Sequence, residues 1–203
     1  LSFYQVKHVM PKINRRGKSE IISDLEYVRI LNALKSEWMQ LVVSIARYTG
    51  ERWGAILQLK VEDVYADPTR RIPRDWITFR AETRKANPSG ERQTRQVPTH
   101  QNLMRDLKAY QPPLEGWLFK SDRIPGEHIQ FQTAYLNFRS ACETVGIRGA
   151  STHSTRRTFI TQLYERGVGL PTIQATTGHR DLKVLAGYID GSPEKVRQAI
   201  ACL

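Results

Sequence analysis

Cysteine is scarce in this chain of 203 residues, which contains only Cys142 and Cys202. They lie 60 positions apart, and neither belongs to a C-x-x-C pair or to another metal-binding spacing. This spacing favours neither a disulfide scaffold nor a zinc finger, and two free thiols fit a reducing cytosol. We therefore expect a cytoplasmic protein.

The sequence also lacks a long hydrophobic run. Its most apolar stretch, residues 38–48, is interrupted by Gln40, Ser44 and Arg47, whereas about 20 apolar residues are needed to span a bilayer. No secretory signal pattern is visible, and we expect no association with a membrane. The chain opens on Leu1 rather than Met and has helical patterning within two dozen residues, so we expect a fragment or an excised domain.

Acidic residues are few relative to basic ones. Lys and Arg total 31 and Asp and Glu 20, which gives a net charge of +11 and a pI near 9.9. This excess points to a polyanionic partner, with nucleic acid as the first candidate, although charge alone supports only non-specific binding. A dense carboxylate cluster is missing, so two-metal catalysis is disfavoured, and we expect no metal and no cofactor.

Helical patterning covers most of the chain, with apolar residues at 40% of positions. Ser23 to Glu26 fits a capping box that starts a helix with Leu25, Val28, Leu31 and Leu34 on one face. A second helix opens at Ser36, with Met39, Val42, Val43 and Ala46 on its apolar face, and closes at Gly50. Further helices are predicted over residues 56–59, 101–110, 129–145, 154–166, 171–178, 181–188 and 193–201.

One segment has strand patterning instead. Residues 76–81 and 94–98 predict two strands joined by a turn at 87–90, whereas Asp67-Pro68 and Ile72-Pro73 indicate loops. The hairpin is rich in cations, and its polar face could follow a DNA groove or backbone: Arg80, Arg84, Lys85, Arg92 and Arg95 outnumber Glu82 and Glu91. The fold class expected is α+β, mainly α, with a small antiparallel sheet.

The first 20 residues form a separate basic segment with a single acid, Glu20. This segment is predicted to be an arm along a phosphate backbone or, equally, a solvated tail. Residues 21–203 are then expected to form the main domain.

Four side chains suggest phosphodiester chemistry. Cleavage needs charge stabilisation on phosphate oxygens, which the planar guanidinium of arginine supplies at any physiological pH. Arg52, just past a helix end, and Arg156, near a helix start, are the candidate pair. His153 is three residues before Arg156, and His179 follows Gly178 at a helix end, so both histidines are candidates for moving protons. Taken singly, His153 would fit a polar cap or core histidine, His179 a cation near a helix C-terminus, and Arg156 a solvated charge.

Tyr188 is the candidate nucleophile. It is one of eight tyrosines, and an isolated tyrosine is more often part of a core or an interface. Its position favours the functional alternative, because it falls nine residues after His179 and 32 after Arg156.

This ordered set resembles the catalytic domain of the tyrosine recombinases, the phage integrase family. In that family an Arg follows a T-G turn, a Lys lies in a β-hairpin, H-x-x-R opens a helix, G-H follows, and a Tyr lies near the C-terminus. The matching segments are Thr49-Gly50-Glu51-Arg52, His153-Ser154-Thr155-Arg156, Thr177-Gly178-His179 and Gly187-Tyr188. The resemblance covers about residues 20–200, and such an ordered series is far more specific than one motif.

The resemblance implies a role for each residue. Tyr188 would attack the scissile phosphate and form a 3′-phosphotyrosyl link, while Arg52, Arg156 and His179 would stabilise the transition state. His153 would assist proton transfer. Lys85, the only lysine between Lys60 and Lys108, would protonate the leaving 5′ oxygen.

Three positions depart from the family pattern. Ala55 stands where an acidic residue is frequent, so Arg52 needs another orienting partner. Thr155 replaces a usually apolar residue, and Ala86 follows Lys85 where Thr is frequent.

The resemblance implies a site-specific recombinase that acts on double-stranded DNA without metal or ATP. It also implies that the protein is prokaryotic or phage-encoded and nucleoid-associated. It implies a monomer alone and a tetramer on paired DNA sites, with an N-terminal DNA-binding domain absent from this chain. A DNA-binding regulator without catalysis is one alternative, and a type IB topoisomerase is another. The target sequence and the direction of recombination are not predicted.

Overall fold

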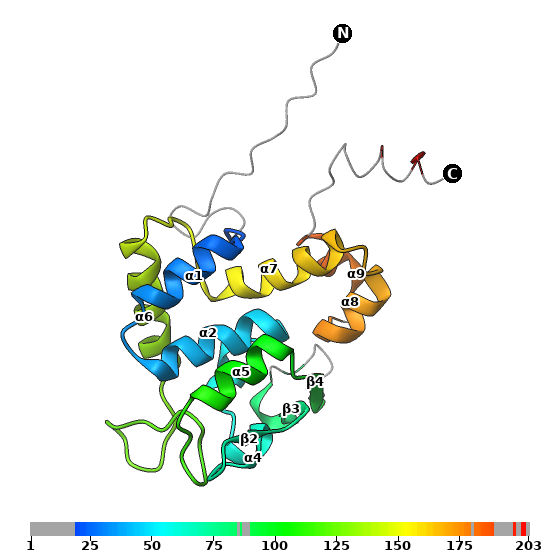
Figure 1. The fold of residues 1–203 in the computed structure, drawn as a ribbon. Helices are drawn as coiled ribbons and strands as arrows, with labels where there is room; N and C mark the ends of the chain where they lie inside the picture. The colour runs from blue at the N-terminus through cyan, green and yellow to red at the C-terminus, as the bar shows by residue number, and fades with distance from the viewer. Residues whose placement is uncertain are drawn as a thin grey trace. The chain divides into compact units, whose positions relative to one another are not determined.

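A computed structural model describes residues 19–84, 86, 90–179, 181–188, 197, 200 and 201 (Figure 1). The chain divides into two compact units, residues 1–159 and 160–203. The described residues are mainly helical, with two small antiparallel sheets, so the expected fold class is confirmed. Among them, no helix has both the length and the apolar character needed to cross a membrane.

Helix α2 (Glu37–Thr49) lies at the centre of the first unit. It packs against α3 (Trp53–Leu57), α5 (Gln101–Ala109) and α6 (Phe131–Thr144) (Figure 1). Its predicted apolar positions are all buried, which places the core of this unit around α2: Met39, Val42, Val43 and Ala46. As predicted, α2 ends at Gly50, which takes the left-handed conformation with φ 61°.

Helix α1 (Asp24–Ala33) begins with the predicted capping box. The Ser23 hydroxyl accepts a hydrogen bond from the Glu26 N–H, and the Glu26 carboxylate accepts one from the Ser23 N–H at 2.8 Å. These reciprocal bonds satisfy two of the N–H groups that a helix start leaves without partners.

Only part of the predicted face of α1 is buried. Leu34 is in the core and Leu31 packs against it, whereas Leu25 is 71% exposed and Val28 is 50% exposed. Tyr27 and Ile30 are buried in their place. Because α1 packs against α6, the position of α6 decides which side of α1 is covered. Periodicity alone cannot choose between two adjacent apolar faces.

The predicted hairpin is present as β3 (Trp76–Phe79) and β4 (Arg95–Pro98). The strands pair antiparallel, with Trp76 opposite Pro98 and Phe79 opposite Arg95. The first strand is two residues shorter than predicted, because Ala81–Thr83 form a 3-10 helix.

The predicted loops around Asp67 and Ile72 are wrong. Residues Tyr65–Asp67 (β1) and Ile72–Pro73 (β2) pair as a second antiparallel hairpin, next to α4 (Val61–Val64). Strands this short carry too few residues for an alternating pattern, which explains why the sequence did not reveal them.

Other buried residues extend the core of the first unit. Leu118 and Phe119 are buried in the short segment before α6. Cys142 is also buried, and this burial raises the pKa of its thiol to about 12. The thiol is therefore neutral at physiological pH and chemically inert in the folded state.

The described part of the second unit includes the end of α7 and the two short helices that follow it. Helix α7 (Thr152–Glu165) passes from the first unit into the second, followed by α8 (Leu170–Thr177) and α9 (Leu182–Ala186). Ile160, Ile173 and Leu185 are its buried apolar residues among those described. The basic arm, apart from residues 19 and 20, and most of the predicted final helix lie outside the described residues.

Candidate active site

Arg52 stands at the start of α3, directly after the left-handed turn that ends α2. Its backbone is extended (φ −72°, ψ 138°), as expected for the residue that precedes a helix. Its side chain is exposed, and within the described chain no hydrogen bond or ion pair holds its guanidinium. The side chain is therefore accessible to an anion such as a phosphate.

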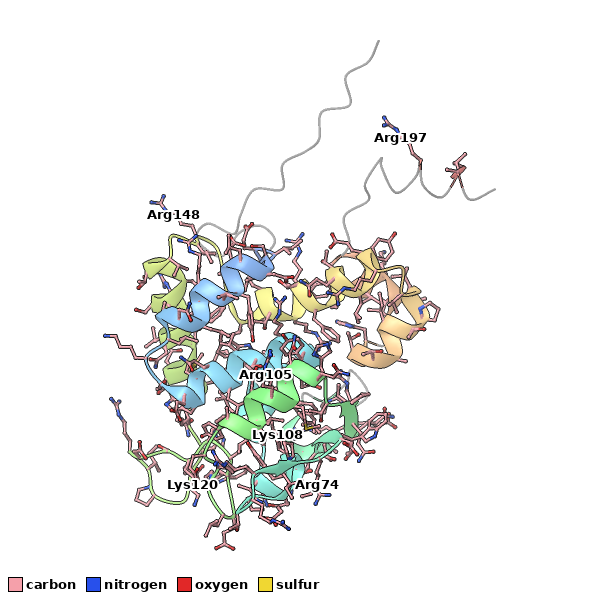
Figure 2. The ribbon with its side chains drawn as sticks, viewed as in Figure 1. Arg74, Arg105, Lys108, Lys120, Arg148 and Arg197 are labelled. Carbon is pink, nitrogen blue, oxygen red and sulfur yellow. The ribbon has the colours of Figure 1, made fainter. Side chains whose placement is uncertain are left out.

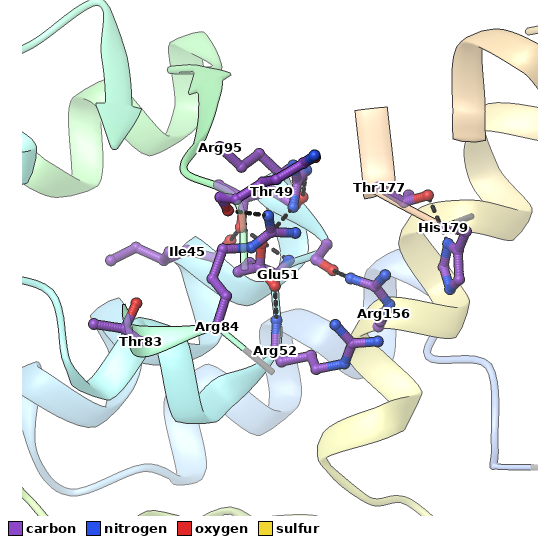
Figure 3. A network of polar contacts seen from close by, with 12 residues as sticks. Ile45, Thr49, Glu51, Arg52, Thr83, Arg84, Arg95, Arg156, Thr177 and His179 are labelled. Carbon is purple, nitrogen blue, oxygen red and sulfur yellow. Dashed lines mark hydrogen bonds and ion pairs between the residues drawn. The ribbon is translucent and has the colours of Figure 1, made fainter. Parts of the chain in front are cut away.

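Glu51 is the residue that supports this turn, and the sequence reasoning missed it. The side chain is only 1% exposed, and its Oε1 accepts a hydrogen bond from the Arg52 N–H at 2.8 Å. Its Oε2 accepts hydrogen bonds from Arg95 Nη1 at 2.7 Å and Arg84 Nε at 3.2 Å (Figure 3). An acidic residue directly before Arg52 was the available signal.

Two of the hairpin arginines have partners within their own chain. Arg95 points inward from β4 and is 8% exposed, while Arg80 forms ion pairs of 2.8 Å with Glu62 and Asp63. A buried carboxylate requires cations nearby, so these arginines serve carboxylates of their own chain.

The contribution of Glu51 to the stability of the fold should depend on pH. Burial acts to raise the pKa of its carboxyl group, but the charges of Arg95 and Arg84 outweigh burial and lower it. A carboxyl group whose pKa is lower in the folded state stabilises the fold above its unfolded pKa, about 4.3, and loses this contribution as the pH falls through the folded pKa.

We therefore expect the melting temperature of the native chain to exceed that of Glu51→Gln at pH 7, and the difference to shrink below about pH 4. Thermal denaturation of both proteins between pH 7 and pH 3 measures this. A difference in melting temperature that stays constant between pH 7 and pH 3 would contradict this expectation.

Arg156 is buried in the first turns of α7, at 3% exposure, which excludes a fully solvated charge. Its Nη1 donates a hydrogen bond of 2.5 Å to the carbonyl oxygen of Gly50 (Figure 3). This bond joins Arg156 to the turn that carries Arg52, two residues further along the chain. The predicted arginine pair is thus brought together within the first unit.

Thr155 makes a second connection, from α7 to α3. Its hydroxyl accepts a hydrogen bond from the indole N–H of Trp53 at 3.1 Å and donates one to the Thr152 carbonyl at 2.9 Å. Trp53 directly follows Arg52, and both Trp53 and Thr155 are buried. The departure from an apolar residue at position 155 therefore supplies the acceptor that the buried indole needs.

Replacing Thr155 with valine should destabilise the chain by about 1–3 kcal/mol, because the buried Trp53 N–H would lose its acceptor. Chemical denaturation measures this loss. Thr144→Val is the matched control, since the exposed Thr144 hydroxyl bonds only to the Ser140 carbonyl. It should change stability by less than about 0.5 kcal/mol. Equal losses in the two variants would contradict the role of the indole bond.

His153 and Lys85 complete the candidates predicted in residues 1–159. His153 lies in the first turn of α7 and is exposed, and its backbone N–H donates to the Ser151 hydroxyl at 3.3 Å. Lys85 lies outside the described residues, although Arg84 directly before it is described.

The second unit brings His179 and Tyr188 together. Their ring centroids are 5.5 Å apart, with the ring planes tilted by 53°. The Tyr188 carbonyl accepts a hydrogen bond of 3.3 Å from the Thr161 hydroxyl, which ties the tyrosine backbone to α7. Tyr188 is half-buried, just beyond the end of α9.

The surroundings of His179 indicate its tautomer. The imidazole Nδ1 lies 2.7 Å from the Thr177 hydroxyl (Figure 3), and that hydroxyl donates to the Ile173 carbonyl at 2.7 Å. A hydroxyl has one proton to donate, so when Thr177 donates it to the Ile173 carbonyl, the proton of the bond between Thr177 and His179 comes from Nδ1.

Surface cations extend well beyond these residues. Figure 2 shows Arg74, Arg105, Lys108 and Lys120, all on the first unit and all exposed. Together with the net charge of +11, they make the first unit able to attract a polyanion.

Comparison with known proteins identifies the family. The model of the phage integrase family matches residues 20–195, which include all the candidate residues. The chain belongs to the phage integrase family. The match therefore spans the whole ordered series of candidate residues, from Arg52 to Tyr188.

Two curated relatives are tyrosine recombinases. A XerC-like tyrosine recombinase of Caldanaerobacter subterraneus subsp. tengcongensis is 27% identical, over 91% of this chain and 54% of its own. The tyrosine recombinase XerA of Saccharolobus solfataricus is 26% identical, over 90% and 56%. The chain thus spans about half the length of the curated relatives it matches.

Solved structures of the family share the fold. A XerA recombinase structure has a TM-score of 0.66 at 22% identity, covering 90% of this chain and 64% of its own. The catalytic domain of bacteriophage HP1 integrase has a TM-score of 0.62 at 21% identity, covering 91% and 95%. The XerH site-specific recombinase bound to its difH substrate has a TM-score of 0.63 at 17% identity, covering 93% and 55%.

Proposed function

We propose that this chain is the catalytic domain of a site-specific DNA recombinase or integrase. It cleaves and rejoins duplex DNA through a 3′-phosphotyrosyl intermediate at Tyr188. The observation that carries this proposal is the hydrogen bond from Arg156 to the Gly50 carbonyl, in the turn that leads to Arg52, in a chain of the phage integrase family. Two guanidinium groups near one another supply the charge and the hydrogen-bond donors that a phosphodiester needs in its transition state.

The reaction is a transesterification. The Tyr188 oxygen forms a bond to phosphorus as the bond to the 5′ oxygen breaks, and the tyrosine loses its proton. Arg52, Arg156 and His179 stabilise the charge on the non-bridging oxygens, and His153 assists proton transfer. Because the phosphotyrosine conserves the bond energy, a 5′ hydroxyl from another strand can reverse the attack without ATP.

The leaving 5′ oxygen needs a proton, and we assign its delivery to Lys85. A substrate with sulfur in place of this oxygen leaves without protonation, because a thiolate is a far weaker base than an alkoxide. We expect Lys85→Ala to lose about 10²-fold or more in cleavage of ordinary DNA and to regain near-native rates on the 5′-phosphorothiolate. Equal losses on both substrates would remove this role from Lys85.

Covalent trapping from a random library tests the function and finds the target sequence in the same experiment. A library of nicked duplexes with random sequence around the nick is incubated with the protein in EDTA, and adducts that survive denaturation are recovered and sequenced. A recombinase yields adducts with a shared sequence, and peptide mapping places the DNA on Tyr188.

Two other outcomes would overturn the proposal. Sequence-specific binding without any adduct would identify a DNA-binding regulator. Adducts with no shared sequence, together with relaxation of supercoiled plasmids, would identify a topoisomerase-like activity. The surface cations and the DNA-bound structure of the XerH recombinase support duplex DNA as the partner.

The assembly expected on DNA is a tetramer on two paired sites, formed from monomers, and residues 1–20 act as a basic arm along the backbone. An N-terminal DNA-binding domain completes the full-length protein. Light scattering with and without the recovered DNA site measures the assembly. A stable oligomer without DNA would contradict it.

A further inference from the structure

We propose that Glu51 is the positioning residue for Arg52, in place of the acid that the family often carries where this chain has Ala55. This inference rests on the proposed function, because it assigns Glu51 a part in the same reaction. Ala55 is buried in α3 and has no charge to offer. Glu51 lies on the other side of Arg52 and supplies the only carboxylate described as bonded to this turn.

The contacts of Glu51 fix the turn from several directions. One oxygen holds the Arg52 N–H at 2.8 Å, and the other holds Arg95 at 2.7 Å. Arg95 also donates from Nη2 to the Thr49 carbonyl at 2.8 Å, which closes a ring of bonds around residues 49–52. The start of α3, and with it the backbone of Arg52, is thereby fixed relative to β4.

The same carboxylate reaches the other side of the hairpin. Arg84 donates from Nε to Glu51 at 3.2 Å and from Nη1 to the Gln93 carbonyl at 2.7 Å. Glu51 therefore joins the Arg52 turn to both ends of the segment between β3 and β4 (Figure 3). Its charge also offsets the mutual repulsion of Arg84 and Arg95, which are both mostly buried.

Glu51→Gln tests the role, because the amide keeps the size of the side chain and loses the charge that holds the two arginines. Single-turnover cleavage is measured on a recovered DNA site with either a normal scissile phosphate or a neutral methylphosphonate. The methylphosphonate lacks one charged oxygen, so its cleavage depends less on the charge of Arg52. Arg52→Ala provides the reference for this substrate dependence.

On the normal phosphate, we expect Glu51→Gln to slow cleavage by about tenfold or more, with DNA affinity changed by less than about threefold. On the methylphosphonate, the loss should shrink to less than about threefold, following Arg52→Ala. Equal losses on the two substrates, or no loss on the phosphate, would overturn the proposal.

Glu62→Gln is the matched control. Glu62 also pairs with an arginine, Arg80 at 2.8 Å, but it has no contact with the Arg52 turn. It should cleave both substrates at the native rate, and a loss like that of Glu51→Gln would mean that any lost ion pair of this unit impairs cleavage.

A second variant keeps the test decisive if Glu51→Gln does not fold. Glu51→Asp retains the negative charge for Arg84 and Arg95, but its shorter arm cannot reach both Arg95 and the Arg52 N–H. For Glu51→Asp we expect the same pattern as for Glu51→Gln, a large loss of cleavage on the normal phosphate and a small loss on the methylphosphonate. Equal losses on the two substrates would overturn the proposal. If the native chain forms no adduct with either substrate, the proposed function itself fails, which is a distinct result.

Discussion

Replacing Tyr188 with phenylalanine is expected to abolish the covalent protein–DNA adduct, lowering its rate of formation by about 10⁴-fold or more. The change removes only the hydroxyl oxygen that would bond to phosphorus, and no other group can conserve the bond in its place. The ring remains, so its packing beside His179, at 5.5 Å between centroids, should be retained. Denaturing gel electrophoresis with a nicked suicide duplex measures the adduct.

Tyr164→Phe is the control for this experiment. Tyr164 is a half-buried tyrosine of α7, so the substitution is chemically identical, and no part of the proposed reaction uses it. It should form adduct at the native rate. DNA affinity should stay near the native value in both variants, and an adduct formed by Tyr188→Phe would assign the nucleophile to another residue.

Gly50→Ala is expected to be the most damaging small substitution in the first unit. Gly50 has φ 61°, and a left-handed conformation costs a residue with a side chain about 1–2 kcal/mol. An added Cβ would also overlap the Phe159 ring, with Cε1 only 2.9 Å away. Overpacking of this kind adds about 1–3 kcal/mol, so we expect a total loss of about 2–5 kcal/mol in the free energy of unfolding.

Activity should fall along with stability. The Gly50 carbonyl accepts the Arg156 hydrogen bond, and Arg52 follows two residues later, so a displaced turn moves both arginines. A misplacement of about 1 Å in a catalytic group can cost about 10²-fold in rate, and we expect a loss of this order in single-turnover cleavage at a temperature where the variant is folded.

Gly146→Ala separates the cost of the left-handed conformation from the cost of the overlap with Phe159. Gly146 has φ 80°, but a Cβ there would meet nothing within 4 Å. It should lose only the conformational term of about 1–2 kcal/mol and should cleave DNA normally. If Gly50→Ala is no worse than Gly146→Ala in denaturation and cleavage, the close approach of Phe159 is not important.

Much of the fold could be predicted because it depends on neighbours in the sequence. The Ser23 capping box, the end of α2 at Gly50 and the end of α8 at Gly178 each follow from local hydrogen bonds and backbone freedom. The β1–β2 hairpin could not be predicted, because its strands have only three and two residues. The exposed face of α1 was likewise decided by its packing against α6.

The candidate site likewise has a part that the sequence predicted and a part that only the structure revealed. Order and spacing along one chain were enough to predict the members of the series: Arg52, His153, Arg156, His179 and Tyr188. The groups that support them became visible only in the folded chain. Glu51, Arg84 and Arg95 meet although up to 44 positions separate them, and Trp53 reaches Thr155 across 102 positions. A buried charge or indole N–H must find its partner in space, and no local pattern records which distant residue that partner is.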